Sequence, residues 1–100
     1  MLGPNCECCD KDLPPDSTEA YMCSDECTIC HDCVVHRLAN VCPNCGGGFS
    51  PRPIRPAIAR RVGGSLHHQP ASTARIHTPY TTAELSDWRD SVKAIKPEDR

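Results

Sequence analysis

The chain has 100 residues, of which nine are cysteine, ten are proline and only four are aromatic. Its formal net charge of −2 is unevenly spread, because residues 1–50 carry eight acidic side chains against Lys11 and Arg37, whereas residues 51–100 carry nine basic against five acidic ones. This length allows one small domain with an extension, and the acidic first half argues against a module that grips a phosphate backbone.

The first half of the chain needs cross-links. Residues 1–50 contain too few large apolar side chains to offset the entropy lost on ordering the chain. No stretch is typical of a signal peptide and no apolar run approaches the length of a membrane span, so we expect a cytoplasmic protein. Disulfides are rare in that compartment, and an odd number of cysteines suits a disulfide framework poorly. We therefore favour metal binding.

Eight of the nine cysteines form four close pairs. Each spacing lets two sulfurs of one tight turn converge on a tetrahedral ion. The strongest single motif is Cys42-Pro43-Asn44-Cys45-Gly46, in which proline sets the turn and glycine tolerates the positive φ that aims backbone N–H groups at sulfur. The pattern predicts two Zn²⁺ ions and no catalytic residue, because a catalytic zinc keeps one position open. The four pairs are Cys6/Cys9, Cys23/Cys27, Cys30/Cys33 and Cys42/Cys45.

In this order the pairs resemble a RING finger, over about residues 6–45. The resemblance implies a small metal-stabilised α+β fold of the RING-like or treble-clef class, in which cross-bracing joins the first pair to the third and the second to the fourth. A tandem arrangement, as in LIM domains, would use the pairs sequentially, but the eight residues between Cys33 and Cys42 are short for it. Cross-bracing implies site 1 of Cys6, Cys9, Cys30 and Cys33, and site 2 of Cys23, Cys27, Cys42 and Cys45.

The same resemblance implies a short helix between the two sites, over residues 34–39, with Val34, Val35 and Leu38 in a miniature core. Cys8 is left over, and we expect a free thiol near the metal, with ligand exchange or redox sensing as alternatives.

The histidines near the cysteine pairs are not expected to bind metal. Two of them, His31 and His36, flank Cys33, but eight cysteines already fill both metal shells, so we expect both at the surface.

Three parts of the chain are expected to differ in order: a two-zinc module over residues 1–50, an irregular Pro/Arg-rich linker over 51–80, and a helix over 81–96. The alternating prolines after Ser50 favour an extended polyproline segment, and residues 57–80 are expected to be irregular or disordered. The linker arginines Arg52, Arg55, Arg60 and Arg61 are expected to be solvated, and no specific role is expected for His67, His68 and His77.

The C-terminal helix is the clearest regular element. Thr81 and Glu84 match a capping box, and Pro97 marks the stop. A short isolated helix is marginal in water. Its apolar stripe is therefore expected to dock on the chain's own module, on another protein or on a second copy of the chain. The stripe comprises Leu85, Trp88, Val92 and Ile95, at spacings of three, four and three.

The sequence of three segments is more specifically similar to a family of short bacterial cysteine-rich proteins catalogued as a domain of unknown function. The similarity spans about half the chain and implies no activity. It is carried by Pro4–Ser17, Glu26–Cys30 and Val41–Gly47.

We therefore expect a non-enzymatic zinc module that contacts another protein. A zinc store is an alternative, because Tyr21–Cys27 resembles the zinc knuckle of bacterial metallothioneins. A RING-type ubiquitin ligase is another, although Glu7 and Gly46 depart from the ligase pattern and residues 34–39 have no aromatic. A thiol oxidoreductase would need a free dithiol at Cys30 and Cys33, but both sulfurs are expected to bind metal. A nucleic-acid-binding finger would need aromatic residues among its arginines.

Overall fold

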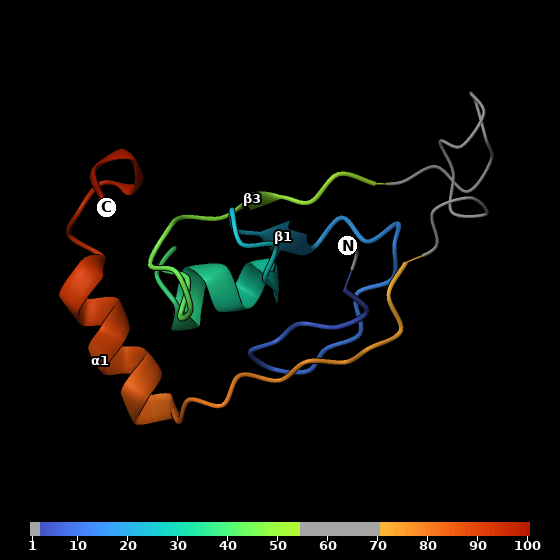
Figure 1. The fold of residues 1–100 in the computed structure, drawn as a ribbon, viewed down its shortest axis with the longest axis horizontal. Coiled ribbons are helices and arrows are strands. Elements are labelled where there is room, and N and C mark those ends of the chain that lie inside the picture. The colour runs from blue at the N-terminus through green and yellow to red at the C-terminus, as the bar shows by residue number, and fades with distance from the viewer. Residues whose placement is uncertain (1–2, 55–70) are drawn as a thin grey trace.

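The computed structural model describes residues 3–54 and 71–100, and Figure 1 shows their course. The regular elements are short, and most of the first half consists of turns. The fold is α+β, as predicted: two strands, one π-helical turn and a third strand follow one another along the chain, the three strands form one antiparallel sheet, and a C-terminal α-helix comes much later. No helix in these two ranges is both long and apolar enough to cross a membrane.

The sheet is a hairpin with a third strand added. The central strand β1 (Ala20–Met22) pairs antiparallel with β2 (Thr28–Cys30) and with β3 (Ser50–Pro51). Aromatic and β-branched side chains favour this pleated surface. Tyr21 lies opposite Ile29 in the register. The hairpin matters for function because its turn carries Cys23 and Cys27, while Cys30 ends β2.

The start of the predicted linker belongs to the sheet instead. The expected polyproline segment begins with β3, whose residues lie opposite Tyr21 and Met22. The following arginine, Arg52, donates its backbone N–H to the carbonyl of Ala20 at 2.8 Å and is only 4% exposed, so the expectation of a solvated side chain is wrong. Pro51 is tolerated because this strand lies at the edge.

Four large aliphatic side chains of the miniature core are fully buried: Leu13, Ile29, Leu38 and Val41. The expected helix over 34–39 is instead a π-helical turn, η1 (Cys33–Arg37), and it buries Val34. The prediction that Val35 joins this core is wrong, because its side chain is 50% exposed. On so short a turn, only one of two adjacent residues can face the sheet.

The chain returns to the module after residue 70. Residues 71–79 contain no helix or strand, but they run beside the N-terminal loop, as the orange and blue segments of Figure 1 show. The backbone N–H of Thr78 donates to the carbonyl of Glu7 at 2.6 Å. This part of the predicted linker is therefore held by contacts. Arg55, Arg60, Arg61, His67 and His68 lie outside the described residues.

The predicted capping box is present at the start of α1 (Thr82–Val92). The Thr81 hydroxyl accepts from the Glu84 N–H at 3.2 Å, and the Glu84 carboxylate accepts from the Thr81 N–H at 3.0 Å. The helix ends at Val92, before the predicted stop, and η2 (Pro97–Asp99) follows. Of the predicted stripe only Leu85 is buried, because Trp88 is 42% and Ile95 43% exposed. The stripe is thus a partial contact with the module.

Candidate metal centres

Two turns of the chain share one backbone geometry. In the first, the N–H of Asp10 donates to the carbonyl of Cys6 at 2.8 Å, and Asp10 has φ 66°. In the second, the N–H of Gly46 donates to the carbonyl of Cys42 at 2.9 Å, and Gly46 has φ 76°. Each pattern closes a Cys-x-x-Cys turn with a left-handed residue directly after the second cysteine. We call these turns knuckle 1 (residues 6–10) and knuckle 2 (residues 42–46).

Donors are aimed at sulfur in both knuckles. The backbone N–H of Cys9 points to the Cys6 Sγ at 3.5 Å, and the N–H of Gly47 points to the Cys45 Sγ at 3.4 Å. The Asn44 side-chain amide donates to the Cys27 Sγ at 3.2 Å. Such donors stabilise negative charge on sulfur, which is the form that binds a metal.

The first group of sulfurs joins knuckle 1 to the end of the hairpin. Four Sγ atoms lie within 4.8 Å of one another, and those of Cys9 and Cys30 are 3.7 Å apart. A disulfide needs about 2.05 Å, whereas sulfurs placed about 2.3 Å from a tetrahedral ion are about 3.8 Å apart. The spacing therefore suits a shared ion. The group consists of Cys6, Cys9, Cys30 and Cys33, of which only Cys9 is exposed.

The second group joins the hairpin turn to knuckle 2. The Sγ atoms of Cys23, Cys27 and Cys42 lie within 4.8 Å of one another, with Cys23 and Cys42 only 3.5 Å apart. Cys45, the fourth predicted ligand, is exposed and does not meet this limit. It occupies the place in knuckle 2 that Cys9 occupies in knuckle 1, and one χ1 torsion governs where its sulfur lies.

The two groups interleave along the chain. The first pair of cysteines meets the third pair, and the second pair meets the first cysteine of the fourth. A tandem arrangement would require Cys6 and Cys9 to meet Cys23 and Cys27, and the structure does not bring them together in one group. The reason is the β1–β2 hairpin, which places its turn and the end of β2 at different sites.

The electrostatics of both groups favour a bound cation. Burial, together with neighbouring sulfurs, raises the pKa of the Cys27 and Cys30 thiols to about 11. Burial also raises the pKa of Cys33 and Cys42. The pKa of Cys9 and Cys23 is lowered instead, because hydrogen bonds to these sulfurs outweigh the effect of burial. Thiolates crowded into such sites repel one another, and a divalent cation would offset their charge. All-sulfur sets with these spacings fit a tetrahedral thiophilic ion.

Cys8 lies in the core beside the first group and is not one of its four members. Burial raises the pKa of its thiol, and the Cys33 side chain and Arg37 are near enough to lower it in part. The histidines that flank Cys33 are exposed, as predicted, and the His31 ring packs against Tyr21 with centroids 5.1 Å apart.

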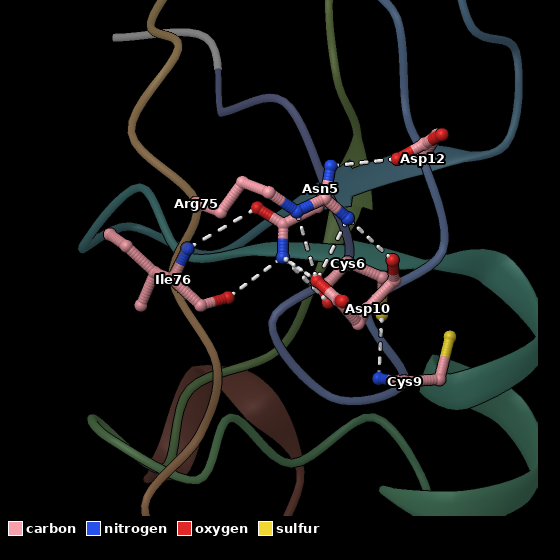
Figure 2. Close-up of polar contacts among 7 residues, drawn as sticks. All are labelled: Asn5, Cys6, Cys9, Asp10, Asp12, Arg75 and Ile76. Atoms are coloured by element: carbon pink, nitrogen blue, oxygen red, sulfur yellow. Dashed lines mark hydrogen bonds and ion pairs between the residues drawn. The ribbon is translucent and has the colours of Figure 1, made fainter.

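Three residues that support the sites belong to none of the cysteine motifs. Asn5 is buried, and its side-chain amide donates to the backbone of Ile76 at 2.8 Å (Figure 2). Arg75 pairs with the Asp10 carboxylate at 2.8 Å. The Arg52 guanidinium donates to the carbonyl of Gly3 at 2.8 Å, and to those of Leu13 and Pro14 at 3.3 and 3.1 Å. Partners so distant in sequence leave no local signal.

The sequence was also compared with known proteins. A curated relative, "Uncharacterized protein R02474" of Rhizobium meliloti (strain 1021), is 53% identical over 78 residues, which cover 78% of this chain and 86% of the relative. No solved structure matches. The family model described as "Protein of unknown function (DUF1272)" matches residues 1–55, a stretch that includes both cysteine groups. The chain therefore belongs to this family, which agrees with the resemblance of its cysteine motifs to short bacterial cysteine-rich proteins.

Proposed function

We propose that the chain is a non-enzymatic structural zinc module, which binds two ions in a cross-braced, RING-like arrangement. The interleaving of the two cysteine groups carries the proposal. Site 1 is assigned to Cys6, Cys9, Cys30 and Cys33, and site 2 to Cys23, Cys27, Cys42 and Cys45. Zinc suits four thiolates in tetrahedral geometry, and a closed all-sulfur shell leaves no position for substrate or water.

The module would depend on its ions for folding. In the described part of the chain four large aliphatic side chains are fully buried, which is few for a module of about fifty residues. Structural zinc contributes about 10–16 kcal/mol per site in small zinc fingers at pH 7. On this basis the ions hold the hairpin, η1 and both knuckles together, and the protein around them serves as a rigid platform.

Metal analysis with X-ray absorption tests this function. Protein purified without added zinc should contain two zinc ions, with sulfur neighbours at about 2.3 Å. Cys6→Ser and Cys30→Ser should perturb one site, and Cys42→Ser the other, which cadmium-113 NMR resolves. Cys8→Ser is the matched control and should keep both ions. Iron in place of zinc, or three or more ions per chain, would contradict the proposal, and the latter would favour a zinc store.

We further propose that the platform contacts another protein. A surface pocket of about 280 Å³ lies between knuckle 2 and α1, and exposed Tyr80 and Trp88 contribute to its lining. Exposed aromatic side chains are enriched at protein interfaces. Host proteins that co-purify with the tagged full chain should be lost with Tyr80→Ala and kept with Thr82→Ala. Equal recovery with both variants would contradict a role for this pocket.

A further inference from the structure

The segment after residue 70 is bound to knuckle 1 by a short ladder of polar contacts. The Asn5 side chain donates to the carbonyl of Ile76 at 2.8 Å and accepts from the Ile76 N–H at 3.3 Å, so that it imitates a backbone partner. The N–H of Thr78 donates to the carbonyl of Glu7, inside the knuckle, at 2.6 Å. Residues 71–78 thus lie against the turn that carries Cys6 and Cys9.

Arg75 reinforces this contact at the residue that closes the knuckle. Its guanidinium meets the Asp10 carboxylate at 2.8 Å, the Asp10 carbonyl at 2.7 Å and the Asp12 carboxylate at 2.7 Å, as Figure 2 shows for the side chains. Asp10 follows Cys9 directly and has a left-handed backbone. A fork of donors held by two carboxylates and a carbonyl restricts this backbone more than one exposed ion pair would.

The last twenty residues contact knuckle 2 in a parallel way. The Trp88 indole N–H donates to the carbonyl of Cys42 at 2.9 Å, and a side-chain carbon added at Gly46 would come within 3.4 Å of the Trp88 ring. Arg100 donates to the carbonyls of Asn40 and Gly46 at 2.6 and 3.3 Å. The same C-terminal segment therefore touches both metal knuckles.

Each knuckle contains the cysteine that a competing ligand can reach most easily. Cys9 and Cys45 are the two exposed cysteines, whereas the other six ligands assigned to the two proposed sites are buried. A competing ligand reaches an exposed sulfur first, and an ion leaves a closed shell only after one sulfur has moved away. The backbone freedom of the knuckle therefore governs how easily this movement occurs.

From these contacts we infer that residues 71–100 form a clasp that closes both knuckles and slows the release of metal from each, with Arg75 acting on site 1 and Trp88 on site 2. The inference rests on the proposed function, because it requires that the sulfur groups bind metal. Arg75 and Trp88 are positioning residues, because the hydrogen bonds described above join Arg75 to the Asp10 carbonyl and to two carboxylates, and Trp88 to the Cys42 carbonyl. The clasp lies beyond the part of the chain that the family model matches, residues 1–55.

Site-resolved metal release from the full chain tests the clasp. The protein is loaded with two cadmium-113 ions, each resonance is assigned to its cysteines, and the loss of each signal is followed after excess EDTA is added. Arg75→Gln should speed release from site 1 about three- to tenfold and leave site 2 within twofold, because several charge-assisted hydrogen bonds are lost at knuckle 1 alone. Arg75→Lys should restore part of the delay. Trp88→Phe, which keeps an aromatic ring of smaller size and removes the donor, should speed site 2 alone.

Lys93→Gln is the control. It removes one positive charge from the same segment, and this lysine pairs only with Asp90 among the contacts of the described chain. It should change neither rate. Equal acceleration of metal release from both sites by Arg75→Gln would overturn the clasp. So would unchanged release rates in both Arg75→Gln and Trp88→Phe. Failure of the wild-type chain to take up two ions on sulfur would instead overturn the proposed function.

Discussion

Replacing Arg52 by alanine should destabilise the protein strongly, although no motif marks this residue. Arg52 is 4% exposed, and it joins β3 to the N-terminal loop through donors to Gly3, Leu13 and Pro14. No carboxylate lies among these partners, and burial lowers the pKa of the guanidinium. Three backbone carbonyls therefore solvate a buried cation.

The expected magnitude is a balance of two effects. Hydrogen bonds from a charged donor contribute about 1.5–3 kcal/mol each, whereas burying the charge costs several kcal/mol. The alanine variant removes both effects, but it leaves three carbonyls without their donor, at about 1–3 kcal/mol for each that water cannot reach. We expect a loss of about 3 kcal/mol in the free energy of unfolding, which is a large part of the stability of a small domain.

Urea unfolding at a buffered free zinc concentration measures this loss, because bound metal stabilises the folded state by mass action. Amide NMR intensities follow the sheet directly. Arg52→Met keeps most of the apolar stem and should lose nearly as much stability as alanine. Arg52→Lys keeps the charge and should lose less stability than either of these variants. A loss below about 1 kcal/mol in the alanine variant would show that the carbonyl contacts do not stabilise the fold.

Three further predictions test other parts of the structure. Thr81→Ala removes the cap of α1 and should cost about 1 kcal/mol, seen as faster amide exchange at Glu84 with no change at β1; unchanged exchange would contradict the capping box. Gly46→Ala should cost about 1–2 kcal/mol of unfolding free energy because φ there is 76°, and an unaffected protein would show that knuckle 2 adopts another conformation. Chelation should shift Trp88 fluorescence to the red in the monomer, because its ring N–H is bonded to the Cys42 carbonyl; an unshifted spectrum after confirmed metal loss would mean that α1 stays docked without metal.

Local features of this protein follow from the sequence by itself. The knuckles and the capping box depend on residues three or four positions apart, so their spacing is enough to predict them. The α+β class and the family follow from the same short motifs. The choice of Val34 over Val35 as the buried residue of η1 does not, because two adjacent valines give no period to decide which one faces the sheet.

Contacts between distant segments were decided only by the tertiary structure. The hairpin brings Cys30 to knuckle 1 and Cys23 to knuckle 2, so the interleaving of the groups follows from the fold more than from any spacing. In the sequence Arg52 does not differ from the other linker arginines. In the fold it binds the carbonyls of Leu13 and Pro14, which are 39 and 38 positions away along the chain. Asn5 and Ile76 are 71 positions apart, and no property of either residue predicts their contact. Such pairings depend on the shape of the whole chain, because each is one of many that polar side chains of the same kind could form.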